Sequence, residues 1–135
     1  MVKAEDTTDF AEMQAGHIRA FREAAPESAR VSRGLVVSPT DSATAEQRAK
    51  YAAYVDARSA RIGVPQGPGK LLFAQDLLGT SEQIAEALYA HAGFREVREV
   101  VFALPFSFEH EDYVQLLTDI VTHLGPALGW QPTYA

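Results

Sequence analysis

The sequence predicts an α/β fold in which helices cover a mostly parallel sheet. Two short, apolar, β-prone runs are each ended by a proline, as expected for buried strands. Around them lie longer stretches in which apolar residues recur every three or four positions, the period of a helical face. The resulting order is helix, strand, helix, loop, helix, strand, helix, which is typical of parallel α/β sheets. The 135 residues suit a single domain, which we expect to span residues 1–135.

The first expected helix covers residues 7–24, and Pro26 ends it. Its apolar or partly apolar positions follow spacings of three and four: Phe10, Met13, His17 and Phe21. Because His17 falls on this apolar face, we expect it to be a hydrogen-bonded histidine of the core rather than a metal ligand.

The first predicted strand is the apolar run 35–37, which ends near Ser38 and is closed by Pro39. A long helix should follow, because Thr44 and Gln47 have the spacing of a capping box. One face of this helix is marked by Tyr51, Val55, Arg58 and Ile62. We expect the Arg58 stem to be buried on that face while its guanidinium reaches water.

Residues 63–70 hold three glycines and two prolines in eight positions, so we expect a loop or a hinge there. These glycines do not have the spacing of a phosphate-binding loop. The following segment, 71–78, is short and apolar, and its pattern leaves open whether it is a strand or a packed irregular segment.

The next predicted helix begins at about Thr80 and ends at Gly93. Its core-facing residues are Ile84, Ala85 and Leu88. A second strand is expected within residues 96–104, where 100–104 form the most continuous β-prone run of the chain, and Pro105 ends it.

The last predicted helix has the most regular apolar period, and we expect it to be buried against the sheet. Its apolar positions are Tyr113, Leu116, Leu117, Ile120, Val121 and Leu124. Gly125 and Pro126 follow this run and are expected to end the helix.

Composition excludes several functional classes. The 18 acidic residues outnumber the 12 basic ones, and the formal charge of −6 would repel a phosphate backbone, so we expect no nucleic acid partner. The absence of cysteine removes disulfides, zinc–thiolate sites, iron–sulfur clusters and thiol nucleophiles. No apolar stretch is long enough to span a membrane, and the N-terminal segment lacks the apolar core of a signal peptide. We therefore expect a cytoplasmic protein without a membrane partner.

Residues 79–83, GTSEQ, could form either an anion site or a helix cap. The free N–H groups and the dipole of a helix start favour a phosphate. Thr80 and Gln83, however, have the spacing of a capping box, and a negative Glu82 would oppose a second anion. We therefore favour a structural role for this segment.

The spacing of residues assembles no catalytic or metal site. The histidines lack a second ligand at the i+3 or i+4 spacing of helical metal sites: His17, His91, His110 and His123. His110, Glu111 and Asp112 are adjacent and point in different directions, so we interpret them as a favourable first helical turn. A serine nucleophile elbow, G-x-S-x-G, is absent. Catalytic and cofactor-binding residues are therefore left unassigned, and we expect no metal.

The loop after the second strand carries two aromatic residues, Phe106 and Phe108. They could face a ligand, because α/β proteins place binding loops at strand ends. They could equally plug the end of the sheet and pack on the next helix. The sequence favours neither alternative.

Four stretches together resemble the C-terminal part of the luciferase-like monooxygenase family. They are SRGLVVSPT, DLLGTSEQIAEAL, REVVFALPFSFEHEDY and LLTDIVTHLGPALGW, and the likeness extends from about Phe10 to Trp130. The resemblance implies a (β/α)8 TIM barrel, of which this chain would form the last few βα units. It also implies FMN or the deazaflavin F420 as cofactor, for oxidation or monooxygenation.

A complete barrel of this kind needs about 250 residues, whereas the chain has 135. In the family, the earlier strands and a phosphate loop rich in serine and glycine make most of the contacts to the flavin. No position in this chain matches those residues. We therefore expect a fragment, a truncated gene product or a natural half-barrel. Because an open apolar sheet edge is a template for pairing, the chain should form a homo-oligomer or associate with a missing barrel half.

The function implied by the resemblance is that of one part of a flavin- or F420-dependent oxidoreductase acting on a small molecule that the sequence does not identify. The isolated chain is expected to be inactive. The alternative is a non-catalytic half-barrel that serves as an interaction module or subunit and lacks its own cofactor site. A stand-alone small α/β enzyme is the weakest hypothesis, because neither a nucleophile elbow nor a phosphate loop is present.

Overall fold

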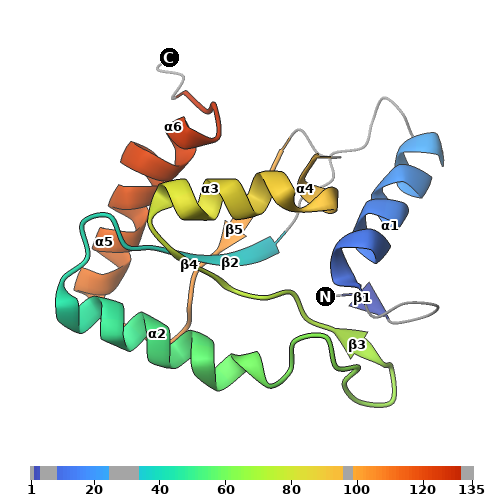
Figure 1. The fold of residues 1–135 in the computed structure, drawn as a ribbon, viewed down its shortest axis with the longest axis horizontal. Helices are drawn as coiled ribbons and strands as arrows, with labels where there is room; N and C mark the ends of the chain where they lie inside the picture. The colour runs from blue at the N-terminus through green and yellow to red at the C-terminus, as the bar shows by residue number, and fades with distance from the viewer. Residues whose placement is uncertain (1, 4–8, 25–33, 96–98, 132–135) are drawn as a thin grey trace.

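The structure, a computed structural model, describes residues 2–3, 9–24, 34–95 and 99–131 (Figure 1). Its main sheet has three strands in the order β4-β2-β5, and both pairings are parallel. The strands are β2 (Gly34–Pro39), β4 (Leu77–Gly79) and β5 (Val101–Ala103). The predicted α/β class and parallel sheet are confirmed in these ranges.

Helices alternate with the strands of the main sheet. In chain order they are α1 (Phe10–Ala24), α2 (Ala45–Ser59), α3 (Ser81–Ala90), α4 (Ala92–Arg95), α5 (His110–Asp119), the π-helical turn η1 (Ile120–Leu124) and α6 (Gly125–Ala127). A small antiparallel sheet pairs β1 (Val2–Lys3) with β3 (Leu71–Leu72). Figure 1 shows α1 and this small sheet at one end of the molecule, with α5 at the other.

The central strand β2 holds the main sheet together through two separate pairings. Its second half, Val37–Pro39, pairs with β4, and its first half, Gly34–Val36, pairs with β5. Leu35 and Val37, on one face of β2, are buried against α3 and η1, whereas Val36 between them is half-buried. The resulting core cluster consists of Leu35, Val37, Ile84, Ala85, Leu88 and Leu124.

The helix predicted after the first strand is α2, and its capping box is formed. The Thr44 hydroxyl accepts a hydrogen bond from the Gln47 N–H at 3.1 Å, and the Gln47 side chain accepts one from the Thr44 N–H at 3.0 Å. Of the predicted face, Tyr51 is fully buried. Ile62 lies beyond the end of the helix at Ser59.

The second predicted capping box is also formed, at the start of α3. The Thr80 hydroxyl accepts from the Gln83 N–H at 3.3 Å, and the Gln83 side chain accepts from the Thr80 N–H at 3.0 Å. The predicted end at Gly93 is wrong. The helix ends at Ala90, because His91 has extended backbone angles, and Gly93 lies inside α4.

The segment before α3 combines the alternatives that its sequence left open. Residues 63–70 form a loop, as predicted, made of turns and a bend with an isolated bridge at Gln66, and Gly63 and Gly67 have φ 71° and 65°. Within 71–78, β3 and the start of β4 are strands, and the residues between them are irregular. Asp76 in this irregular part is buried and accepts a hydrogen bond from Arg58 Nε at 2.6 Å, so it anchors the segment to α2.

The predicted buried face of the first helix is partly wrong. Phe10 and Met13 are buried in α1, but His17 is exposed and Phe21 is 51% exposed. Ile18 is buried in their place, and every side chain from 19 to 24 is exposed. The described neighbours of α1 therefore cover only its first half. The apolar period continues into the second half, but those side chains are exposed. The predicted start at residue 7 lies outside the described residues.

The last predicted helix is present as α5, but the expected stop and part of the expected face are wrong. Leu117 in α5 and Val121 in the π-helical turn η1 are 50% and 52% exposed, whereas Leu124 at the end of η1 is buried. Gly125 has helical backbone angles, and Pro126 occupies the first turn of α6, where its missing N–H costs nothing. The helical run therefore continues to Ala127.

The second predicted strand is shorter than expected. The pairing of β5 covers Val101–Ala103, within the run 100–104 that the sequence favours. Residues 96–98 of the predicted strand lie outside the described residues.

Candidate functional site

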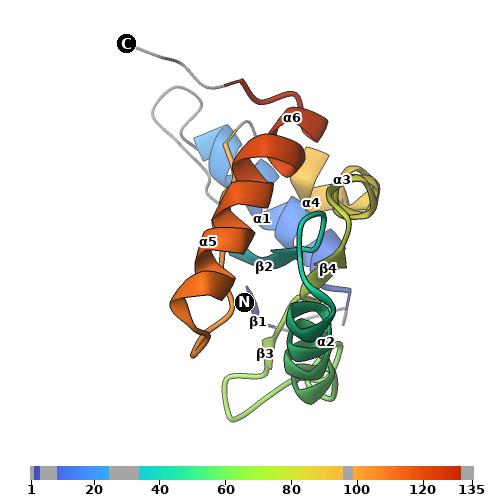
Figure 2. The same ribbon diagram turned by 90° about the vertical axis from the view of Figure 1, so that its left-hand side faces the viewer.

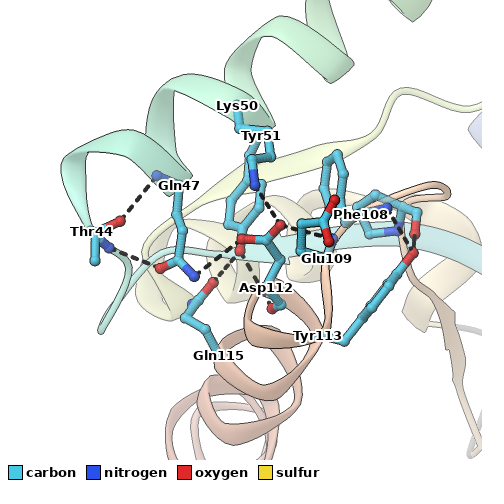
Figure 3. Close-up of polar contacts among 10 residues, drawn as sticks. Thr44, Gln47, Lys50, Tyr51, Phe108, Glu109, Asp112, Tyr113 and Gln115 are labelled. Carbon is cyan, nitrogen blue, oxygen red and sulfur yellow. Dashed lines mark hydrogen bonds and ion pairs between the residues drawn. The ribbon is translucent and has the colours of Figure 1, made fainter.

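Polar side chains gather where the carboxyl ends of β2 and β5 meet the starts of α2, α3 and α5. Figure 3 shows side chains from the first turns of α2 and α5 pointing toward one another. Because α/β proteins place ligand-binding loops at this end of the strands, these residues form the candidate site. We call them the carboxyl edge: Asp41, Ser42, Lys50, Tyr51, Ser81, Asp112, Gln115 and Asp119.

Asp112 joins α5 to α2 through an ion pair. Its side chain is 3% exposed and lies 2.6 Å from Lys50 Nζ; it also accepts hydrogen bonds from Gln47 Nε2 at 3.2 Å and the Glu109 N–H at 3.1 Å. Burial alone would raise the pKa of this carboxyl, but the hydrogen bonds from Lys50, Glu109 and Gln47 outweigh it, and the pKa lies below its ordinary value. The hydrogen bond to Asp112 raises the pKa of Lys50 in turn. Both groups are therefore charged at neutral pH.

Tyr51 lies under this ion pair and is fully buried. Its hydroxyl donates to Gln115 Oε1 at 2.6 Å, and its ring stacks on Phe108 with centroids 5.2 Å apart. Burial, followed by the negative charges of Asp112 and Asp119, raises the pKa of Tyr51 to about 12. The phenol is therefore protonated at physiological pH.

Asp119 is fully buried and binds the loop that follows β2. It accepts from the Ser42 N–H at 2.9 Å, from the Ser42 hydroxyl at 2.7 Å and from Gln115 Nε2 at 2.5 Å. The Gln115 amide also donates to the Pro39 carbonyl at 2.9 Å. A continuous chain of hydrogen bonds thus runs from Tyr51 through Gln115 and Asp119 to Ser42.

Asp41 occupies the start of α3. Its carboxylate accepts from the Ser81 N–H at 3.1 Å and from the Ser81 hydroxyl at 2.6 Å. The anion that the helix start attracts is therefore a side chain of the chain itself. Together with the capping box, this contact confirms the structural interpretation of the GTSEQ segment. Gly79 is required just before it, because its φ is 149° and a Cβ there would lie 2.6 Å from Gln83 Oε1.

The two aromatic residues of the loop after β5 have different environments. Phe108 packs against Tyr51 and Tyr54, with ring centroids 5.2 and 5.3 Å away, so the plugging interpretation holds for it. Phe106 is 69% exposed, and only its N–H is engaged, by the Tyr54 hydroxyl at 3.3 Å. Ser107 between them has φ 63°, which turns the two rings apart.

The histidines do not converge in the structure. His17 lies on α1, His91 follows α3, His110 begins α5 and His123 lies on η1. In the described ranges, no group of three or more metal-binding side chains comes together. The first-turn interpretation of residues 110–112 is confirmed for Glu111 and Asp112, although the sequence did not reveal that Asp112 is buried against Lys50.

The carboxyl edge does not fit the phosphate of FMN or F420. A phosphate site needs free N–H groups or unpaired cations. The start of α3 is bound to Asp41, and Lys50 is bound to Asp112. Arg58, near the C-terminal end of α2, is paired with Asp76. The α3 start, Lys50 and Arg58 are already bound within the chain, so they hold loops in place and none of the three is available for a phosphate.

Sequence reasoning missed the three carboxylate contacts that build this site. Their partners lie 40, 62 and 77 positions apart, so no local spacing reveals them. One signal was present: Asp112, Gln115 and Asp119 follow the helical period among apolar residues. Polar side chains on the buried face of a helix need buried partners.

Comparison of the chain with protein-family models, with curated proteins and with solved structures gives no match. The α/β fold class therefore rests on the observed arrangement of helices and parallel strands. None of the helices in the described ranges is both long and apolar enough to cross a bilayer.

Proposed function

We propose that this chain is one part of a flavin- or F420-dependent oxidoreductase or monooxygenase of the luciferase-like class. It supplies a wall of parallel strands and a rigid carboxyl edge, while the other part of the barrel, supplied by a partner, holds the cofactor phosphate. One observation carries the proposal: parallel strands alternate with helices, and their loops meet at a single polar edge. Enzymes built as (β/α)8 barrels place their reacting groups at that edge.

The carboxyl edge acts by positioning in this proposal. Asp119 fixes the loop after β2, and Asp112 with Lys50 ties the start of α5 to α2. Asp41 fixes the start of α3 to the same loop. A binding site completed by other residues gains precision when the loops beneath it are held in one geometry.

The test uses the protein isolated from its native cell together with whatever it binds there. The absorption spectrum reports bound flavin or F420, and calorimetry measures the binding of each cofactor to the complex and to the isolated chain. Stoichiometric cofactor in the native complex supports the proposal. If neither the complex nor the isolated chain binds FMN or F420, the catalytic proposal fails.

The order of the strands provides a second test. Consecutive strands of a (β/α)8 barrel are neighbours, so β5 would pair with β4 in a completed barrel, whereas it pairs with β2 here. An experimental structure of the native assembly with the order β2-β4-β5 would support the barrel. If the assembly instead has the order β4-β2-β5, the sheet is not part of a barrel of this kind, and the barrel proposal fails.

A second candidate function, a non-catalytic interaction module or subunit, is favoured by an apolar stripe on the last helical run. Val114, Leu117 and Val121 are 50%, 50% and 52% exposed, and they follow helical spacing. Contiguous exposed apolar side chains are typical of surfaces that another protein covers. The function is tested by chromatography with light scattering on the parent and on Leu117→Glu. Self-association, or a partner, that Leu117→Glu releases supports the module, and a monomer that binds cofactor contradicts it.

A further inference from the structure

We propose that an apolar groove beside the start of β5 binds a small, uncharged aromatic molecule. The groove has a volume of about 480 Å³ and lies between the end of α3, β5 and the η1–α6 turn. We call it the aromatic groove, and its principal side chains are Tyr89, Phe94, Phe102, Ile120, Leu128 and Trp130. This site is independent of the function proposed above.

The groove is separate from the carboxyl edge. Both α3 and the run α5–η1–α6 begin at the carboxyl edge, and the groove is lined by residues at their far ends. Figures 1 and 2 show α6 next to α3 from two directions. A ligand in the groove would therefore contact none of the carboxylates described above.

The lining determines the class of ligand. None of the described residues that line the groove has a charged side chain, so a charged ligand would lose hydration there without gaining a partner among them. The net charge of −6 further disfavours an anion. Tyr89 and Phe94 stand edge to face, with centroids 5.5 Å apart, and present ring surfaces that another aromatic ring can extend. The volume lies in the range of small-molecule sites.

One wall of the groove is formed by Trp130, which packs closely on Gly125. The backbone N–H of Trp130 donates to the Gly125 carbonyl at 2.9 Å, and a Cβ on Gly125 would lie 2.7 Å from Cε3 of the Trp130 indole. The indole can therefore lie directly on the helix backbone only because residue 125 is glycine. Trp130 remains 48% exposed in this position, so part of its surface is free to contact a ligand.

The test compares two probes that share one ring system. N-phenyl-1-naphthylamine is uncharged, and 8-anilino-1-naphthalenesulfonate carries one negative charge. We expect saturable binding of the uncharged probe to the full chain, with energy transfer from Trp130, the only tryptophan. The dissociation constant of the sulfonate should be at least about tenfold higher than that of the uncharged probe, which corresponds to about 1.4 kcal/mol in binding free energy. Equal or tighter binding of the sulfonate would overturn the proposal, and this comparison needs no variant.

A matched pair of variants locates the site. Val121 lines the groove and is 52% exposed, whereas Val114 lies two turns earlier, outside the lining, and is 50% exposed. We expect Val121→Asp to lower the affinity for the uncharged probe about tenfold or more, because it places a charge against the bound apolar ring. Val114→Asp should leave this affinity unchanged. Unchanged affinity in Val121→Asp would overturn the proposal. Loss of probe binding in both variants, together with a molar mass lower than that of the parent by light scattering, would also overturn it. That result would mean that a second copy of the chain covers this face.

Discussion

At the carboxyl edge, the carboxylates of Asp41, Asp112 and Asp119 are each bound within the chain, whereas the aromatic groove offers only ring faces and aliphatic side chains. The same helices run between these two regions. A satisfied polar network holds its loops in one geometry and leaves no group free for a ligand. An uncovered apolar surface contributes stability only when something covers it. In this chain, the described polar groups at the end of the sheet that topology favours for ligands are bound to one another, and the aromatic groove lies at the other end of the same helices.

The largest expected effect tests whether the carboxyl edge is locked. Asp119→Ala removes the acceptor of two Ser42 donors and leaves the Gln115 amide short of a partner, all at a fully buried position. We expect a loss of about 3 kcal/mol in the free energy of unfolding, measured by urea denaturation. Glu111→Ala, an exposed acid on the same helix, should cost less than about 0.5 kcal/mol. Similar losses in the two variants would mean that the network is not locked.

A smaller effect is expected from the ion pair, and it depends on pH. The folded pKa of Asp112 lies below its ordinary value of 3.8, so the unfolded chain binds this proton more readily. The resulting stability is present above pH 3.8 and is lost as the pH falls through the folded pKa. Lys50→Met removes the main partner and should lower stability at neutral pH, with the difference from the parent disappearing in acid.

Lys70→Met is the matched control for Lys50→Met, because it changes the net charge equally in an exposed loop. Urea denaturation of the three proteins over a pH series separates the pair from the general charge. An equal pH dependence in both variants would show that net charge, and not the contact with Asp112, produces the effect.

The smallest expected effect concerns the start of α3. Asp41→Ser removes the carboxylate that binds the Ser81 N–H and hydroxyl, which should cost about 1 kcal/mol. The vacated helix start should then accept an external anion, so phosphate should raise the melting temperature of the variant more than that of the parent. Glu82→Gln serves as the control that reduces negative charge but keeps Asp41 in place. The closed character of this edge would be in doubt if phosphate stabilised all three proteins equally.

Local patterns in the sequence predicted the local structure well. The spacing of Thr44 with Gln47, and of Thr80 with Gln83, predicted two helix starts that both form. The apolar period predicted the burial of Ile84 and Leu88 in α3. These features depend only on residues within one or two turns, where the geometry of a helix fixes which side chains meet.

The sequence failed where a partner or a change of helical pitch decides the outcome. Phe21 has the right period for a buried face, but no described neighbour covers it. Val121 is 52% exposed inside the π-helical turn, where the pitch departs from the period that predicted its burial. The contact between Asp119 and Ser42 joins residues 77 positions apart. The barrel and the flavin chemistry implied by the family resemblance stay proposals for the same reason, because both depend on partners beyond these local patterns.

The divided pairing of β2 has a consequence for hydrogen exchange. Three residues of this strand pair with β5 and the next three with β4, so neither neighbour spans it. If one edge strand separates, the amides of β2 that face it lose protection while the others keep theirs. The β2 amides bonded to β4 and those bonded to β5 should therefore lose protection separately, and their exchange rates would reveal which side of the sheet opens first.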